Sequence, residues 1–339
     1  MRQVYDEVLL LCPEVKTGGP EALHQLGYQI AQHGGTARMV YYGPHSRIEV
    51  DGAILRCHAD ASPMPAHFAQ YQPNVLRETH LGPNTLVVYP EPLSKLAAEA
   101  NGGYLRAIWW LSLDNAMAQN QDLAHADLDT RHALFADPSL IHLYQSDYAR
   151  HFLAAGGAAQ FHPLSDYTDP QFVHRSQVTS DVVPIAERNN IACFFPNKGA
   201  DRAARFLQNA ATMRHHIDFV PIRDMTKAQV RDTLFRARIY IDFGHHPGKD
   251  RVPREAAIAG AVVLLHAAGA ANCFQDHKLP ATYRFTEDDI ASGALHRRID
   301  AILDAPAAHF AAQRPYRQAI LLEQERFDLE VRGFFFDGL

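Results

Sequence analysis

The sequence predicts an α/β protein of two Rossmann-like, doubly wound parallel-sheet domains that face each other across a cleft. Short apolar runs alternate with stretches of helical spacing, which is typical of parallel strands covered by helices on both faces. A polar stretch at 165–187, with two prolines, interrupts this alternation, and a second series follows it. The length of 339 residues suits about two domains.

The interruption sets the expected domain boundaries. We expect an N-terminal domain at 1–168, a linker at 169–187 and a C-terminal domain at 188–310. The last segment, 311–339, is expected to be a helix that packs back across the domains.

The first domain opens with an apolar run at 8–12, which predicts a buried strand. The following segment, 17–33, has a glycine pair, a proline and apolar residues at helical spacing, so it predicts a loop and then a helix. Further strands are expected, the last three each followed by a helix, at 37–42, 85–89, 106–111 and 140–145.

The second domain repeats this order. Its expected strands lie at 191–195, 217–221, 239–243 and 261–265, and its expected helices at 203–213, 226–237 and 253–259, before closing helices at 287–332. In such sheets ligands bind beyond the carboxyl ends of the strands. Polar residues that follow a strand are therefore the candidates for a site.

The composition limits the class of protein. The net charge of −6 disfavours a nucleic-acid-binding surface, and 47% apolar residues disfavour a largely disordered chain. The sequence shows no signal peptide and no apolar run of about 18 residues, so we expect a cytoplasmic protein. The four cysteines form no CxxC pair and are expected to be reduced thiols, and most of the 20 histidines are expected at the surface.

The segment 241–257, between a strand and a helix, gathers the most chemistry. Glycines there allow close approach of backbone, a helix N-terminus attracts phosphate, and cations add charge. Glu255 is positioned to accept hydrogen bonds from ribose hydroxyls. The alternative is a solvated loop in which Glu255 only caps the helix. The candidate residues are Gly244, His245, His246, Gly248, Lys249, Asp250, Arg251, Arg254 and Glu255.

Each domain has one further candidate turn, directly after its first strand. Lys198-Gly199 is expected to neutralise a phosphate, the alternative being an ordinary surface turn. The segment Gly18-Gly19-Pro20-Glu21 is expected to form a loop that admits substrate or phosphate against backbone, the alternative being a tight turn. It matches neither GxGxxG nor a P-loop, so NAD and a Walker-type ATP site are not supported.

Other strand ends of the first domain supply acceptor-site or base candidates, namely Glu91, Asp114, Ser146 and Tyr148. Ser146 and Asp114 are equally good helix caps. Asp127 and Asp129 imitate a metal-binding DxD pair, but they lie in a helix-like region rather than after a strand. We therefore expect no metal site.

These motifs resemble glycosyltransferases of the GT-B fold. Gly18-Gly19-Pro20-Glu21 is similar to their glycine-rich first loop, and Pro196-Asn197-Lys198-Gly199 to the turn whose lysine meets the donor diphosphate. The segment 253–263 is similar to the helix and strand of retaining enzymes in which a glutamate, here Glu255, holds the nucleotide ribose. The segments 145–148 and 164–167 resemble capsule and lipopolysaccharide enzymes of bacteria. Pro247 stands where the retaining families carry a first glutamate, and Asp250, Lys249 or His246 are the candidates to replace its contacts.

The resemblance implies a metal-independent, cytoplasmic glycosyltransferase of polysaccharide biosynthesis with no cofactor. Its second domain would bind a nucleotide-sugar, with the diphosphate near Lys198, Lys249, Arg251 and Arg254 and the ribose at Glu255. Its first domain would bind a glycan or lipid-linked glycan acceptor. It implies no nucleic-acid partner, and it leaves peripheral contact with the inner membrane and the oligomeric state open. The alternatives are a nucleotide-sugar epimerase of the same fold, using carboxylates such as Glu91 or Asp114, and a non-catalytic nucleotide-sugar-binding protein.

Overall fold

The computed structural model describes residues 3–43, 46–59, 66–119, 133–178 and 182–338. These residues form two compact units. Unit 1 comprises Met1–Asp166 with Gln324–Leu339, and unit 2 comprises Tyr167–Glu323. The pair Asp127 and Asp129 lies outside the described residues.

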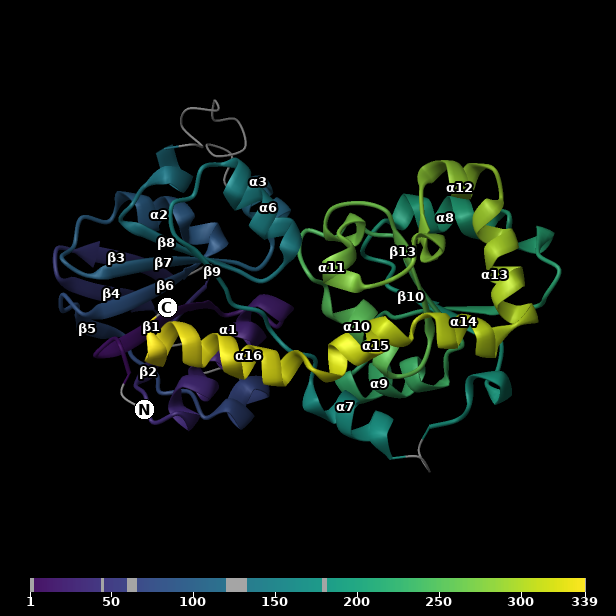
Figure 1. Ribbon diagram of the computed structural model, residues 1–339, viewed down its shortest axis with the longest axis horizontal. Helices are drawn as coiled ribbons and strands as arrows, with labels where there is room; N and C mark the ends of the chain where they lie inside the picture. The colour runs from purple at the N-terminus through teal and green to yellow at the C-terminus, as the bar shows by residue number, and fades with distance from the viewer. Residues whose placement is uncertain (1–2, 44–45, 60–65, 120–132, 179–181, 339) are drawn as a thin grey trace. The chain divides into compact units, whose positions relative to one another are not determined.

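Unit 1 is built on a six-stranded parallel sheet in the order β2-β1-β6-β7-β8-β9 (Figure 1). Its strands are β1 (Glu7–Pro13), β2 (Ala37–Tyr42), β6 (Thr85–Pro90), β7 (Leu105–Trp110), β8 (Leu140–Tyr144) and β9 (Phe161–Pro163). Its helices include α1 (Gly18–Gln32), α2 (Ser94–Glu99), α3 (Leu113–Gln119), α6 (Asp147–Ala155) and α16 (Glu323–Arg332), which begins on the last residue of unit 2. The five strands expected in the first domain are confirmed.

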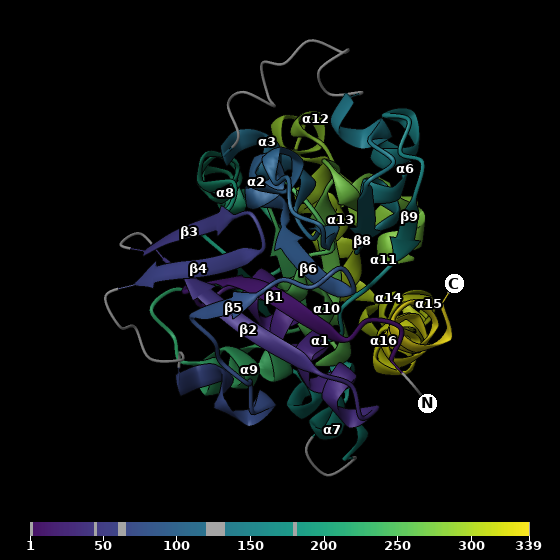
Figure 2. The same ribbon diagram turned by 90° about the vertical axis from the view of Figure 1, so that its left-hand side faces the viewer.

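A small antiparallel sheet of unit 1 was not expected from the sequence. It contains β3 (Ser46–Asp51), β4 (Ile54–Ala59) and β5 (Glu78–His80), and Figure 2 shows β3 and β4 beside the parallel strands. Gly52, at φ +57°, occupies the tight turn between β3 and β4. Only one face of such a sheet is buried, so its strands lack the continuous apolar runs that mark the parallel ones.

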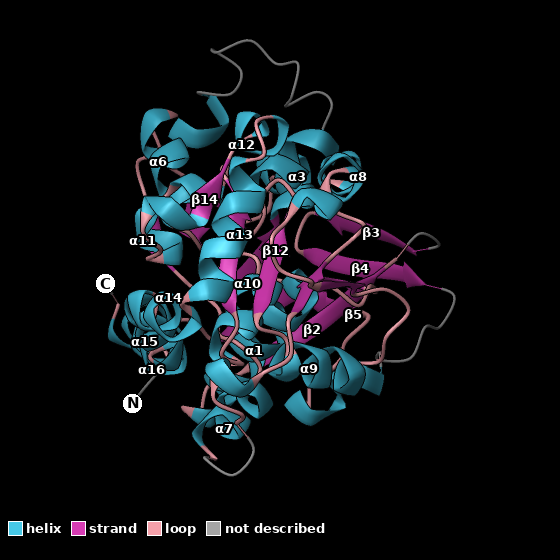
Figure 3. Ribbon diagram, turned by 90° about the vertical axis from the view of Figure 1, so that its right-hand side faces the viewer, coloured by secondary structure: helices cyan, strands magenta, loops and turns pink. Residues whose placement is uncertain are grey.

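Unit 2 is built on a five-stranded parallel sheet in the order β11-β10-β12-β13-β14, and Figure 3 shows its helices packed around the strands. Its strands are β10 (Ile191–Phe194), β11 (Asp218–Pro221), β12 (Ile239–Asp242), β13 (Val262–His266) and β14 (Arg284–Phe285). Its helices include α7 (Pro170–Gln177), α8 (Ala200–Gln208), α9 (Lys227–Arg236), α10 (Arg251–Ile258), α11 (Phe274–His277), α12 (Glu287–Ala291), α13 (Ala294–Asp304), α14 (Pro306–Ala312) and α15 (Arg314–Leu321).

The segment expected as a linker, 169–187, contains ordered structure instead. The Asp169 side chain accepts a hydrogen bond from the Gln171 backbone, and Pro170 occupies the first position of α7. Phe172 and Ile185 are buried in the hydrophobic core of unit 2. The prolines of this segment therefore begin short helical turns, since proline is tolerated where no backbone donor is needed.

Two other expectations from the sequence concern burial and membranes. Among the described residues, six histidines are buried, at positions 24, 142, 246, 266, 277 and 296, and the expectation that most of the 20 lie at the surface is compatible with this number. None of the four cysteines forms a disulfide. Across the described part of the chain, no helix combines the length and apolar character needed to cross a bilayer.

Candidate functional site

Two glycine-bearing turns interlock at the carboxyl edge of the unit 2 sheet. Gly199 follows β10 and has φ +69°, and a Cβ added to it would lie 2.0 Å from the carbonyl oxygen of Phe243. Gly244 follows β12, and a Cβ there would lie 2.7 Å from Cβ of Lys198. The two turns therefore pack backbone against backbone. The structure thus brings together two of the motifs that the sequence singled out.

A partly buried charge network lies beside this contact. Lys198 Nζ lies 2.8 Å from Oδ2 of Asp250, and His246 Nδ1 lies 3.0 Å from the same oxygen. His246 Nε2 lies 3.9 Å from Oδ1 of Asp242, which accepts a hydrogen bond of 2.9 Å from the Gly244 backbone. Tyr240 donates a hydrogen bond of 3.0 Å to the other Asp242 oxygen. The network ties the Lys198 turn to the end of β12 and to the start of α10.

The charges in this network support one another. Burial acts to lower the pKa of His246, but the Asp242 and Asp250 carboxylates outweigh it and leave that pKa above its ordinary value. Burial also opposes the charged form of Asp250, but His246 and Lys198 hold the pKa of its carboxyl well below the usual range. The same balance raises the pKa of Lys198, where Asp250 and Asp242 outweigh burial. The network therefore favours the charged forms of Lys198 and Asp250 and makes His246 easier to protonate than an ordinary imidazole.

Asp242, His246 and Asp250 also meet a geometric condition for holding a metal ion. One ligand atom from each lies within 4.8 Å of the others. Lys198 already places its ammonium group on the Asp250 carboxylate, at 2.8 Å. A cation bound to this set would have to share Asp250 with Lys198. The cation and the ammonium group would then lie close together, and their like charges would repel.

Lys249 and Arg254, both expected at the donor phosphates, have buried protein partners. Lys249 Nζ lies 2.8 Å from Oε1 of Glu323, and Arg254 Nη1 lies 2.9 Å from Oε2 of the same carboxylate. Arg254 has 0% exposed surface and Lys249 9%. In this arrangement Arg254 has no exposed surface for a ligand, so the expectation that it contacts phosphate directly is wrong. Its guanidinium contacts the Glu323 carboxylate inside the protein instead.

The start of α10 differs from the expected one. The helix begins at Arg251 rather than at Pro253, so Pro253 is its third residue and Glu255 lies beyond its first turn. Proline fits there because the first helical N–H groups have no intrahelical acceptor. Arg251 and Glu255 are half-buried and His245 is exposed. With the half-exposed Lys198, these side chains form the accessible part of the candidate donor site.

The expected glycine loop of unit 1 is the first turn of a helix. α1 begins at Gly18, so Gly18, Gly19 and Pro20 are helical, and the backbone donors at this N-terminus follow the end of β1. Glu21 is buried and accepts a hydrogen bond of 3.2 Å from Tyr71. Its carboxylate therefore lies inside unit 1 rather than at the sheet edge.

Two of the other unit 1 candidates lie close together. Tyr148 donates a hydrogen bond of 2.9 Å to Asp114, so residues after β7 and β8 meet at one edge of the sheet. Ser146 caps α6 by accepting a hydrogen bond of 3.1 Å from the Ala149 backbone and is buried. Its capping role, left open by the sequence, is confirmed.

Glu91 is a buried carboxyl group at the end of β6. It is 6% exposed, and its Oε2 accepts a long hydrogen bond of 3.4 Å from the Leu111 backbone. Burial raises the pKa of Glu91 to about 7, although backbone N–H groups act in the opposite direction. A carboxyl group that titrates near neutral pH can both give and take a proton.

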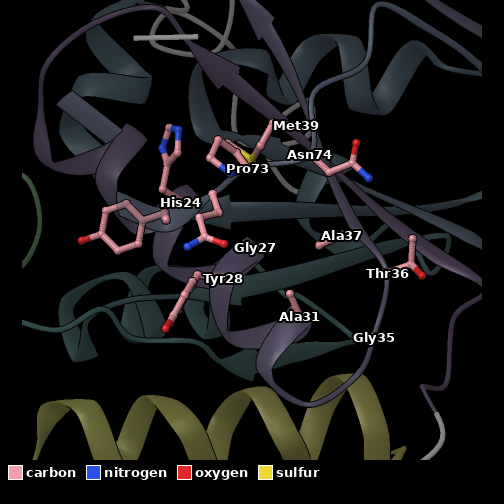
Figure 4. Close-up of a pocket in the computed structure, with 12 residues that line it drawn as sticks. His24, Gly27, Tyr28, Ala31, Gly35, Thr36, Ala37, Met39, Pro73 and Asn74 are labelled. Carbon is pink, nitrogen blue, oxygen red and sulfur yellow. The ribbon is translucent and has the colours of Figure 1, made fainter. Parts of the chain in front are cut away.

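A hollow of about 200 Å³ lies elsewhere on unit 1. Figure 4 shows it between α1, with His24 and Tyr28, and the segment with Pro73 and Asn74. Its lining includes Gly35 and Thr36, which precede β2, so part of it lies at the amino end of that strand. It therefore lies away from the strand-end candidates of unit 1.

Sequence reasoning missed three residues that organise the donor side. Asp242 could have been found, because it ends a predicted strand and directly precedes the glycine loop. Thr168 and Glu323 carry no local signal, since their contacts join positions 155 residues apart.

Comparison with known proteins rests on structure alone. No family model and no curated protein matches the sequence. A sucrose-phosphate synthase from Thermosynechococcus elongatus superposes with a TM-score of 0.60 at 15% identity, covering 97% of this chain and 98% of that one. A variant of TarM from S. aureus, solved with UDP, gives 0.64 at 8% identity, covering 96% and 98%. Anabaena HepE, solved with UDP-glucose, gives 0.56 at 12% identity, covering 97% and 98%.

The chain has the GT-B fold. Units 1 and 2 are its two Rossmann-like parts, as the sequence predicts. Within this fold the interlocked turns of unit 2 and the strand-end carboxylates of unit 1 are the candidate binding and catalytic groups, because ligands bind beyond the carboxyl ends of parallel strands.

Proposed function

We propose that this GT-B protein is a metal-independent glycosyltransferase that moves a sugar from a nucleoside-diphosphate donor to a glycan acceptor. The observation that carries the proposal is the interlocked pair of turns in unit 2, where Lys198 and the 244–254 segment gather cations at the carboxyl edge of the sheet. Two similar structures agree with this donor class, since HepE was solved with UDP-glucose and TarM with UDP.

The charge balance of the donor side favours an anion. Three carboxylates, those of Asp242, Asp250 and Glu323, face Lys198, Lys249, Arg254 and a His246 whose pKa is raised. The three carboxylates match the three cations Lys198, Lys249 and Arg254, so His246, with its raised pKa, and Arg251, at the first position of α10, supply the positive charge beyond that balance. A diphosphate bound at this edge would complete the charge balance.

The proposed mechanism uses this surplus charge to help the leaving group depart. As the bond between the sugar and the diphosphate breaks, negative charge builds on the phosphate oxygens and positive charge on the sugar ring. Lys198, which is half-exposed, and Arg251, at the first position of α10, are the cations that would stabilise the leaving diphosphate, and Glu255 would hold the ribose. Lys249 and Arg254 would support the turn from inside the protein without touching the donor, because they are buried against Glu323.

The acceptor side of the proposal lies in unit 1. Glu91, with its pKa near 7, is the candidate to take a proton from an acceptor hydroxyl. The Asp114–Tyr148 pair supplies further hydrogen-bonding groups at the same sheet edge. A bacterial surface glycan or its lipid-linked precursor is the proposed acceptor, and the cytoplasm the proposed compartment.

A thermal-shift screen with UDP, GDP, CMP and ADP tests the donor class first. A ligand at about 100 times its Kd stabilises the folded protein by about 2.7 kcal/mol, which is readily detected. Incubation with the matching nucleotide-sugars, with and without glycan acceptors, then tests transfer. Release of the nucleotide and a changed sugar without acceptor would favour an epimerase, and binding without turnover would favour a binding protein.

A further inference from the structure

Glu323 is a buried carboxylate on which several cationic and polar donors converge. It is 2% exposed. Its Oε1 receives Lys249 Nζ at 2.8 Å, and its Oε2 receives Arg254 Nη1 at 2.9 Å. The Thr168 backbone and hydroxyl donate to the same Oε2 at 3.0 and 2.9 Å. Glu323 and its three partner residues, Thr168, Lys249 and Arg254, all belong to unit 2. They come from three distant parts of the chain.

The contacts of Arg254 extend this hold to the donor loop. Its guanidinium donates to the carbonyl oxygens of Lys249, at 3.0 Å, and of Asp250, at 3.1 Å. Arg254 therefore holds the backbone of Lys249 and Asp250, the two residues that precede Arg251. Since Glu323 holds both Arg254 and Lys249, it closes residues 249–254 into one rigid turn. The same turn presents the Asp250 carboxylate to Lys198.

We propose that Glu323 is a positioning residue of the donor site, which keeps the 249–254 turn in the form that receives the donor diphosphate. This inference rests on the proposed function. Without the Glu323 charge, Lys249 and Arg254 would be two buried cations close together that have lost the carboxylate both of them contact. Their repulsion would open the turn and move Arg251 and Lys198 from their places beside the diphosphate.

The test compares Glu323→Gln with a matched control, Glu330→Gln. Glu330 lies on the same helix and also accepts hydrogen bonds from a backbone N–H and a hydroxyl, those of Ser165, but it belongs to unit 1. Hydrogen exchange of segment 248–256 and calorimetric affinities for UDP and inorganic pyrophosphate are measured for both variants and the parent chain.

We expect Glu323→Gln to speed exchange across 248–256 and to weaken UDP and pyrophosphate about 10-fold or more, and Glu330→Gln to leave both within about twofold of the parent. In the Glu323→Gln background, Lys249→Met should slow the exchange again, because it removes one of the two cations whose repulsion opens the turn. If Glu323→Gln does not fold, Glu323→Asp, which keeps the charge but withdraws the carboxylate from Lys249 and Arg254, carries the same test.

Unchanged exchange at 248–256 would overturn the positioning role whatever the affinities show. Faster exchange with unchanged affinities would overturn it as well, since the turn would then not matter to the ligand. If the parent chain binds neither probe, the proposed function fails and the inference with it. The exchange data then show whether Glu323 still holds the turn, so the two failures are told apart.

Discussion

Lys198 Nζ lies 2.8 Å from Oδ2 of Asp250, and this ion pair joins two loops whose residues are 52 positions apart. The contact places the cation that follows β10 beside Asp250, the N-cap residue that directly precedes α10. Burial alone would lower the pKa of Lys198, but Asp250 and Asp242 reverse the effect and keep the amine protonated. The pair therefore offers a fixed positive charge at the edge of the unit 2 sheet.

Replacing Lys198 with methionine should weaken nucleoside-diphosphate binding. The side chain keeps its length but loses the charge that we place beside the diphosphate. We expect UDP affinity to fall about 10-fold or more, as hydrogen bonds to charged groups contribute about 1.5–3 kcal/mol. Isothermal calorimetry measures this, with Lys227→Met, an exposed lysine on α9, as the control. Equal losses in the two variants would contradict a specific role for Lys198.

Arg251 should matter more to turnover than to substrate affinity. If its guanidinium meets charge that builds on the leaving diphosphate, Arg251→Ala lowers kcat more than it raises KM. A fall of about 10² in kcat is expected, and Arg251→Lys should recover only part, because an ammonium cannot form a bidentate pair. Steady-state kinetics with Arg236→Ala, an exposed arginine in α9, as the reference measures the effect. Parental kcat in Arg251→Ala would end this assignment.

Glu255 should contribute to nucleotide binding without supporting the fold. It lies beyond the first turn of α10, so its interaction with the helix dipole is weaker than the sequence suggests. Loss of charge-assisted hydrogen bonds to a ribose would cost about 1.5–3 kcal/mol. Glu255→Ala should thus weaken UDP about 10-fold or more while the melting temperature changes little. A large fall in melting temperature with unchanged UDP affinity would show a structural role instead.

Glu91 should make stability depend on pH. Burial raises its pKa from 4.5 to about 7, so between these values the folded chain holds a proton that the unfolded chain has released. The unfolding free energy therefore falls as pH rises through this window, by about 3 kcal/mol. Urea unfolding from pH 4.5 to 8 should show this fall in the parent and not in Glu91→Gln. Parallel profiles for the two proteins would mean that Glu91 ionises freely in the fold.

Nucleotide binding and turnover should survive chelation. Among the described residues, Asp242, His246 and Asp250 form a cluster that could hold a metal ion by geometry. Lys198 already neutralises Asp250 there. EDTA should leave UDP affinity and turnover within about twofold. Activity lost in EDTA and restored by Mg²⁺ or Mn²⁺ would assign that cluster a bound cation and refute the metal-independent mechanism.

Local sequence was sufficient for the parallel sheets and for the placing of the turns. Runs such as 8–12 and 261–265 are apolar throughout because both faces of their strands are covered, and this pattern is visible without neighbours. The strands β3 and β4 escaped notice because one of their faces is not buried in a core. Helix starts shifted by two or three residues, as at Arg251 and Ala200, since a proline or glycine in the first turn leaves the boundary open.

Side-chain partners, in contrast, were decided only by the tertiary structure. Lys249, Arg254 and Lys198 appear equivalent in the sequence, as cations next to glycine turns. The fold sets Arg254 and Lys249 against Glu323 and leaves Lys198 half-exposed beside Asp250. Arg254 and Glu323 are 69 positions apart, and no local pattern links them. Burial and long-range charge pairing depend on how the chain returns on itself, so the sequence marked the loops that gather the chemistry, and only packing determined which cations remain accessible to a ligand.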